Sequence, residues 1–257
     1  MKLSGLRILS LVCLPLFATA QVPDTAKAKK EITIATVNIT ADDVIRKYIN
    51  AIGGEKVLTN IKNVKLVRTA TVQQVPITIT ELRKAPDQMK IMIEGMDMVF
   101  QKVVVGKDSA YQEYMGRKAA LSPAEIIGTR AEADLLAKLT PGKYNVQRAI
   151  KGMAVMDSVD TYVIEETDAT GKTYAFYYDA QTGLLIKKIG SEKTPPGIEP
   201  PAIIVTATTY SDYREVEGSG GYRVPWVVKQ QVGDQMTTIS TIKTAEVNKK
   251  VEDKEFN

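Results

Sequence analysis

The chain has 257 residues, a formal net charge of +4, no histidine and a single cysteine, Cys13. The lack of histidine excludes Ser-His-Asp and Cys-His catalytic arrangements, histidine-ligated zinc and an imidazole base. The basic residues are scattered along the chain and do not form the dense patch typical of nucleic acid binding, so the composition favours a binding role that involves no nucleic acid and no cofactor.

Residues 1–20 have the pattern of a secretory signal peptide. Two basic residues precede an apolar stretch, and Ala18-Thr19-Ala20 matches the small-x-small cleavage site. The apolar stretch is far shorter than the ~20 residues of a membrane-spanning helix. We therefore expect cleavage, loss of Cys13, and a periplasmic protein that does not span the membrane, with a flexible arm at residues 21–40 and one domain at residues 41–257.

The domain is predicted to begin with a helix. Thr40 and Asp43 have the spacing of a capping box, and apolar residues then recur at helical spacing until Gly53-Gly54. A short second helical segment is expected from Glu55 to Ile61. An alternating run at residues 32–39, before this helix, is regular enough to add a strand to a sheet.

Beyond the first helices the hydrophobic pattern changes to a period of two, which is typical of an antiparallel sheet. Turn signals at residues 85–88, 106–108, 168–171 and 179–183 separate successive hairpins. The pattern predicts roughly eleven strands.

One later helix is expected within this series of strands. Ser122 is a cap, Glu125 completes a capping box, and Pro141-Gly142 closes the segment. So small a number of helices cannot cover both faces of a sheet with this many strands. The predicted fold is therefore α+β, with a strongly curved antiparallel sheet that forms an open, incomplete barrel and carries the helices on its concave face. The apolar positions of this later helix are Ile126, Ile127, Leu135, Leu136 and Leu139.

The segment Ala41–Gly54 resembles the opening of exported bacterial domains of the outer-membrane lipoprotein-sorting family, the LolA and LolB carriers. The motifs Tyr178–Leu184, Tyr210-Ser211-Asp212-Tyr213 and Tyr222-Arg223-Val224-Pro225 agree with it, so the resemblance spans about residues 40–257. It implies an open barrel with helices at its mouth, an apolar cavity for the acyl chains of a lipid or lipoprotein, and no enzymatic activity.

A similar module also occurs at the C-terminal end of some exported insulinase-type zinc peptidases. This chain lacks the histidines that such a peptidase needs for its metal. The resemblance therefore leaves a second function open, that of an interaction module with an envelope protein partner and no lipid cargo.

One motif departs from the family. In the carriers an arginine in a Lys-Arg-Pro loop latches the helical lid, and the corresponding loop here is Lys84-Ala85-Pro86. Strand alternation predicts that the neighbouring Arg83 points elsewhere. We therefore expect a more open or differently latched pocket.

The candidate ligand-binding residues are side chains expected to face the cavity. Arg68 stands out because its strand neighbours of the same parity are apolar, and a guanidinium there must be paired, reach water or meet an anionic head group. A β-bulge or a pair with Glu81 would also account for it. The predicted set is Leu66, Arg68, Ile77, Ile79, Met92, Met96, Met98, Phe100, Ile126, Ile127 and Leu136.

Met89 and the three methionines of that set lie within ten residues of one another. Flexible thioethers suit core filling, the lining of a pocket for variable chains, or Cu(I) ligation. Gly95 indicates a turn that divides the group. Glu165 and Glu166 are adjacent, so on a strand they face opposite sides and do not form an acid–base pair.

The strength of burial limits the expected cavity. One buried CH2 contributes about 0.8 kcal/mol, so a fully enclosed 16-carbon chain would approach ~12 kcal/mol. Because a carrier must release its cargo, we predict a partly open groove. In the interaction-module alternative the groove is filled, and a sheet edge or the proline-rich loop at residues 193–201 docks a partner.

Overall fold

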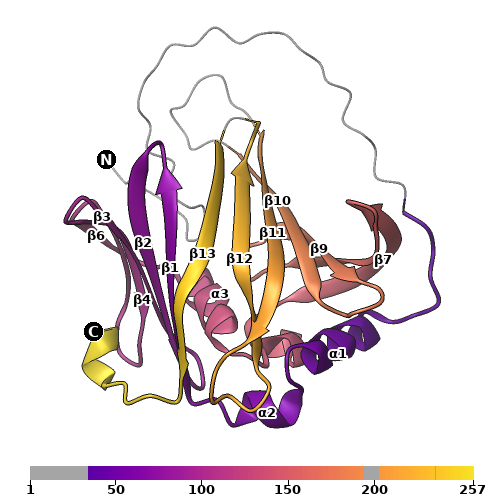
Figure 1. Cartoon of the computed structure of the whole chain (residues 1–257), viewed down its shortest axis with the longest axis horizontal. Coiled ribbons are helices and arrows are strands. Elements are labelled where there is room, and N and C mark those ends of the chain that lie inside the picture. Colours follow the sequence, from indigo (N-terminus) through magenta and orange to yellow (C-terminus); the bar gives the residue numbers. More distant parts are fainter. Residues whose placement is uncertain (1–33, 194–202, 235) are drawn as a thin grey trace, which may run out of the picture.

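The computed structural model describes residues 34–193, 203–234 and 236–257. Within these residues thirteen strands form one antiparallel sheet, and the helices lie on one side of it (Figure 1). The helices are α1 (Ala41–Ala51), α2 (Glu55–Thr59) and α3 (Pro123–Ala133), with 3-10 turns η1 (Ala137–Leu139), η2 (Pro141–Tyr144) and η3 (Asp253–Phe256).

The first half of the chain supplies β1 (Asn63–Val72), β2 (Val75–Lys84), β3 (Gln88–Gly95), β4 (Met98–Val105), β5 (Ala110–Tyr114) and β6 (Arg117–Ala120). The second half supplies β7 (Gln147–Met156), β8 (Val159–Thr167), β9 (Thr173–Asp179), β10 (Leu185–Lys193), β11 (Ile203–Glu215), β12 (Arg223–Val232) and β13 (Met236–Val247). The predicted number of strands was too low; strands as short as β6, whose four residues are all exposed, have no apolar alternation to reveal them.

The sheet is curved and does not close, as the sequence predicted. Its order runs β6-β5-β4-β3-β2-β1-β13-β12-β11-β10-β9-β8-β7, so β1 and β13 join two meanders, and β6 and β7 are the edge strands. All four predicted turns lie between paired strands. We call the face that carries α1 and α3 the inner face and the opposite one the outer face.

α1 packs on the inner face through a strong apolar stripe. The predicted capping box is present: the Thr40 hydroxyl accepts a hydrogen bond from the Asp43 N–H at 3.1 Å, and the Asp43 carboxylate accepts one from the Thr40 N–H at 3.2 Å. Val44, Ile45 and Ile49 are fully buried in the largest apolar cluster, between α1, α2 and strands β1 and β8–β13.

α3 begins as predicted and ends earlier. The Ser122–Glu125 capping box is present, but the helix stops at Ala133, so the prediction that it continues to Leu139 is wrong. The Asp134 side chain accepts hydrogen bonds from the Leu136 N–H at 2.9 Å and the Tyr144 hydroxyl at 2.7 Å, and these bonds stabilise two short 3-10 turns instead.

Residues 121–146, which we call the crossing segment, join the two edge strands β6 and β7. Figure 1 shows α3 of this segment between the two arms of the curved sheet, with α1 and α2 along its lower border. The crossing segment therefore covers the inner face where α1 and α2 do not.

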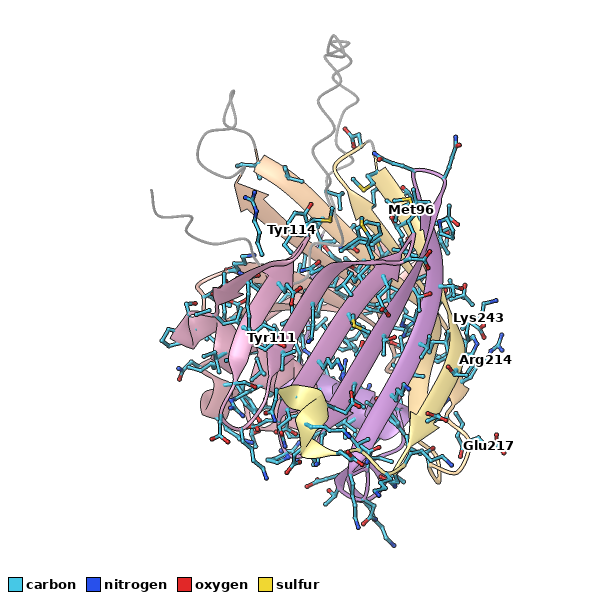
Figure 2. All side chains as sticks on the ribbon, turned by 90° about the vertical axis from the view of Figure 1, so that its left-hand side faces the viewer. Met96, Tyr111, Tyr114, Arg214, Glu217 and Lys243 are labelled. Carbon is cyan, nitrogen blue, oxygen red and sulfur yellow. The ribbon has the colours of Figure 1, made fainter. Side chains whose placement is uncertain are left out.

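The outer face is covered at one place by the C-terminal turn η3. Phe256 is buried there against Leu82, Val104 and Tyr111. The Tyr111 hydroxyl donates a hydrogen bond to the carbonyl of Asn257 at 3.2 Å. Figure 2 labels Tyr111 on the face that η3 covers. This contact fixes the last residues of the chain to β2, β4 and β5.

The N-terminal arm makes one contact with the edge strand β7. Ala35 and Met153 exchange two backbone hydrogen bonds of 2.7 and 2.8 Å, and a Cβ added at Gly152 would lie only 2.1 Å from the Ala35 carbonyl oxygen. The predicted strand at residues 32–39 is thus reduced to a bridge, and its first two residues lie outside the described part of the chain. No helix in the described ranges is both long and apolar enough to cross a membrane.

Candidate ligand-binding site on the inner face

Arg68 lies on the apolar inner face, as predicted. A bulge in the pairing with β13 falls between Val67 and Arg68, and the guanidinium donates hydrogen bonds to the carbonyls of Pro225 (2.9 Å) and Trp226 (3.4 Å). Glu81, which the sequence offered as one possible partner, pairs with Arg83 instead. Arg68 is therefore stabilised mainly by backbone carbonyls of β12.

Arg83 also lies on the inner face, so the prediction that it points elsewhere is wrong. It is paired in register with the buried Val64 and lines a small pocket of about 150 Å³ together with Pro86, Ala133 and Leu136. Burial lowers and the Glu81 carboxylate raises its pKa, with a net rise. The guanidinium thus remains charged beneath the crossing segment.

Two groups of ion pairs attach the crossing segment to the sheet. On one side, Arg130 of α3 donates to the Asp87 carboxylate at 2.7 Å and to the Gly106 carbonyl at 2.9 Å. On the other side, Lys138 donates to Glu166 at 2.9 Å, and Arg148 donates to the same carboxylate at 2.8 Å. Position 85 of the Lys84-Ala85-Pro86 loop is thus an alanine, and the arginine that meets this loop belongs to α3 and contacts the residue after Pro86.

Between these attachments the inner face carries an aromatic row with basic side chains above it. Tyr174, Phe176 and Tyr178 alternate on β9, and Phe176 and Tyr178 are buried. The Tyr174 ring lies across Gly190 of β10, where an added Cβ would be 2.6 Å from a ring carbon. The Lys188 ammonium lies 4.0 Å from the centroid of the Tyr174 ring.

Burial shifts the pKa values of several groups in this region. It raises the pKa of the Glu132 carboxyl on α3 and lowers the pKa of the Lys188 ammonium, although each group retains some solvent contact. Burial also raises the pKa of Tyr210 on β11 to about 12. The centre of the inner face is therefore a weakly solvated environment that contains charged groups.

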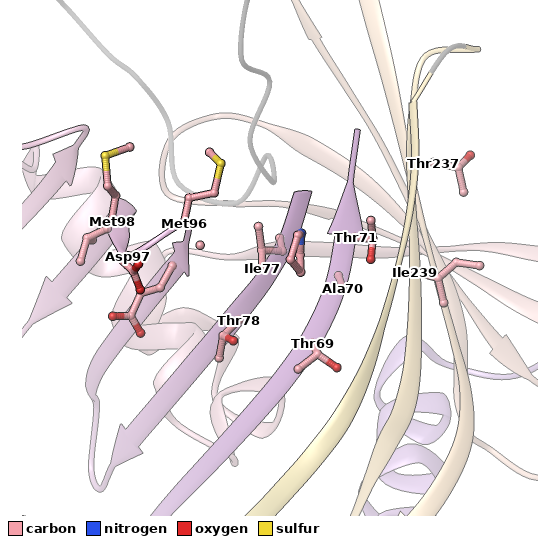
Figure 3. A pocket seen from close by; sticks show the side chains of 14 residues that line it. Thr69, Ala70, Thr71, Ile77, Thr78, Met96, Asp97, Met98, Thr237 and Ile239 are labelled. Carbon is pink, nitrogen blue, oxygen red and sulfur yellow. The ribbon is translucent and has the colours of Figure 1, made fainter. Parts of the chain in front are cut away.

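A wide hollow lies elsewhere, near the tips of β1, β2 and β13 and the β3–β4 turn (Figure 3). It is open, with a volume of about 1060 Å³. Three of the predicted candidates, Ile77, Met96 and Met98, line this hollow. Met96, Met98 and Ile239 are exposed at its border. Its other lining residues include Thr69, Thr71, Thr78 and Thr237.

The predicted candidates are therefore distributed over several environments. Leu66 lies in the main core, and Ile77, Ile79 and Phe100 form a second packed cluster on β1–β4. Met92 is paired with Thr80 and Lys102 on the outer face, so its predicted position on the concave face is wrong. The half-buried candidates of the crossing segment are Ile126, Ile127 and Leu136.

The methionine group does not converge. Met89 is buried on the inner face, Met92 lies on the outer face, and the exposed Met96 and Met98 lie in the turn after Gly95 and at the start of β4. This geometry contradicts a shared Cu(I) site, which would need the sulfurs to meet. Glu165 and Glu166 face opposite sides of β8, as expected, and only Glu166 is buried.

Sequence reasoning missed the residues that attach the cover and line the centre. In the sequence these residues look like exposed positions of a helix: Arg130, Glu132 and Lys138. Their partners, such as Asp87 for Arg130 and Glu166 for Lys138, come close only in the folded sheet. Alternation alone does not show whether Lys187 or Lys188 faces inward. The β-bulge between Leu185 and Lys187 shifts the register, so that Lys188 lies opposite the inward-facing Phe176.

Solved structures identify the fold. A LolA superfamily protein from Nitrosomonas europaea superposes with a TM-score of 0.56 at 12% identity, over 86% of this chain and 98% of that one. The fold is that of LolA-like proteins. A domain assigned to the outer membrane lipoprotein-sorting proteins, from Vibrio parahaemolyticus, gives 0.54 at 10% identity, over 84% of this chain and 95% of that one.

A DUF1329 family protein from Desulfovibrio piger gives a TM-score of 0.52 at 11% identity, over 84% of this chain and 95% of that one. No protein-family model matches the sequence, and no curated protein sequence matches it either. The LolA-like likeness is thus one of architecture.

Proposed function

We propose that the protein is a non-enzymatic carrier or binding protein that holds a lipid or a lipidated protein on the inner face, under the crossing segment. The observation that carries this proposal is the weak packing of that cover. Only Thr129 and Ala133 of α3 are buried, and the leucines after the helix keep partial exposure next to the aromatic row. An acyl chain would bury these apolar surfaces at about 0.8 kcal/mol for each CH2 group.

The LolA-like fold supports this function by analogy, since one of its structural neighbours is assigned to lipoprotein sorting. The histidine-free composition supports a binding role over catalysis. The pattern of residues 1–20 supports export, so we propose that a domain at residues 41–257 acts in the periplasm. Its ligands would be acyl chains, and an envelope protein would be the donor or acceptor.

A second candidate function rests on the hollow near the β-strand tips. The inner face under α1 is filled by the protein's own side chains, whereas Met96 and Met98 are exposed at the hollow, 61% and 47% respectively. An envelope interaction module, for example one accessory to an insulinase-type peptidase, would use this surface and would bind no lipid.

Native mass spectrometry of the protein, purified from a cell envelope without detergent, tests both functions. The carrier function predicts a stoichiometric lipid or acylated peptide, identified after extraction. Leu136→Gln, within the crossing segment, should reduce the bound fraction, and the matched control Met96→Gln, in the hollow, should not. A ligand-free mass that persists after lipids are added would contradict the carrier function and favour the interaction module.

A further inference from the structure

Lys188 is a basic residue on the inner face, and no counter-ion for it lies among the described residues. It lies on β10 opposite Phe176 of β9 and Thr208 of β11. Its ammonium is 4.0 Å from the Tyr174 ring centroid and 5.5 Å from that of Phe176. Among the described residues it makes no hydrogen bond and has no carboxylate within ion-pair distance.

The carboxylates around Lys188 do not meet this need. Glu166 is engaged by Lys138 and Arg148 at 2.9 and 2.8 Å. Glu132 faces the same space from α3, makes no ion pair within the described ranges, and has its pKa raised by burial. A weakly solvated ammonium without a direct partner is costly, because charge in such surroundings needs a compensating charge or hydrogen bonds.

A second ammonium makes the region more basic. Lys138 lies 4.1 Å from the centroid of the Phe176 ring, so both lysines approach the same ring. Burial lowers the pKa of Lys188, Glu132 opposes this shift, and the charge of Lys138 adds to it. An anion placed here would offset the repulsion between the two lysines and would form charge-assisted hydrogen bonds.

We propose that Lys188 binds the anionic head group of an amphiphile, a carboxylate or a phosphate, while the acyl chain lies along Leu135, Leu136 and Leu139. These leucines are half-buried, pack against the cluster that contains Phe176, and flank Lys138 in sequence. This proposal rests on the proposed carrier function and specifies the chemistry of its ligand. The aromatic row would exclude water from the contact and strengthen it.

The test compares three oleoyl ligands that differ in the head group, together with inorganic phosphate, which has no acyl chain. Oleate, methyl oleate, oleoyl lysophosphatidate and inorganic phosphate are titrated calorimetrically into the protein purified from the cell envelope. We expect both anionic lipids to bind about tenfold more tightly than methyl oleate. Lys188→Met should remove this difference without weakening methyl oleate, and Lys188→Arg should restore it.

Lys187→Met is the matched control. Lys187 lies next to Lys188 but on the outer face, with its ammonium 3.5 Å from the Asp157 carboxylate, so the preference for anionic lipids should persist. A preference that survives Lys188→Met, or equal binding of oleate and methyl oleate by the natural protein, would overturn this proposal but leave the carrier function intact.

Two further outcomes separate the remaining possibilities. If neither oleate, methyl oleate nor oleoyl lysophosphatidate binds, both the carrier function and the head-group proposal fail. If inorganic phosphate alone binds and depends on Lys188, the residue belongs to a site for a free anion, and the amphiphile proposal is overturned.

Discussion

α1 and α3 each contain eleven residues and begin with the same type of capping box, yet they cover the inner face in different ways. α1 buries Val44, Ile45 and Ile49 in the main core. α3 buries only Thr129 and Ala133, and ion pairs attach the crossing segment at its two sides. The comparison separates a tightly packed core from a less deeply packed cover, under which we propose that the ligand lies.

The physical basis of this separation is the type of interaction. Burial of apolar surface stabilises α1 by about 25 cal/mol per Å², with no sharp dependence on geometry. The ion pairs of Arg130 and Lys138 are partly buried, so the cost of removing their charges from water offsets much of their attraction and leaves little net stabilisation. The crossing segment therefore opens at a smaller free-energy cost than α1.

The largest expected effect comes from the same truncation in the two helices. Ile45→Ala removes a fully buried side chain and should lower the free energy of unfolding by about 3 kcal/mol, whereas Ile126→Ala removes a half-buried one and should lower it by about 1 kcal/mol. Urea denaturation measures both values. Equal losses would show that α3 belongs to the core.

Two tyrosines near α1 offer a second test of the core. Tyr178 packs edge-on against Tyr48 with a centroid distance of 5.4 Å, and within the described residues its buried hydroxyl has no hydrogen-bond partner. Tyr178→Phe should raise the free energy of unfolding by about 1 kcal/mol. Tyr213→Phe should lower it by a similar amount, because the Tyr213 hydroxyl donates to the Leu185 carbonyl at 2.7 Å. Changes of the same sign would contradict this account.

Removal of one attachment should loosen the cover and leave the core unchanged. Arg130→Met removes the hydrogen bonds to Asp87 and to the Gly106 carbonyl, and we expect a loss of about 1 kcal/mol in stability. Amide hydrogen exchange should accelerate in residues 123–144 and stay constant in residues 41–51. Equal acceleration of both regions would show that the two helices unfold together.

The smallest expected effect concerns pH. The folded-state pKa of Glu132 is raised above its ordinary 4.5 by burial, so its ionisation opposes folding, and stability falls as the pH rises through the raised value. Glu132→Gln should therefore gain stability over the natural protein as the pH rises from about 4 to about 7. Thermal unfolding midpoints measure this gain; a constant difference across that range would contradict the assignment.

Glu166 provides the opposite case and serves as the control. Burial raises its pKa, but Lys138 and Arg148 lower it by more, so the folded value lies below the ordinary 4.5. Its stabilising contribution is present above that ordinary value and is lost as the pH falls. Glu166→Gln should therefore lose stability relative to the natural protein at neutral pH.

Local sequence signals predicted much of the fold because they depend on neighbouring residues. The capping boxes at Thr40 and Ser122, the four turns and the inward position of Arg68 all follow from contacts or periods of a few residues. The early end of α3 escaped prediction because Asp134 and Tyr144 must meet in space before the helix is interrupted.

The candidate site was harder to predict for the same reason. Arg130 meets Asp87, and Lys138 meets Glu166, only after β-strands distant in sequence have paired. Period-two alternation could not choose between Lys187 and Lys188, because the β-bulge after Leu185 shifts the register. Met92 was misplaced because a group of methionines indicates adaptable packing without indicating a face of the sheet.

Hydrogen exchange with and without oleate tests the central claim most directly. If the ligand lies on the inner face under a removable cover, oleate should protect amides in residues 123–144 and in β9 and β10, with no change in residues 41–51. Protection confined to residues 94–99 at the hollow, or no protection at all, would contradict the account.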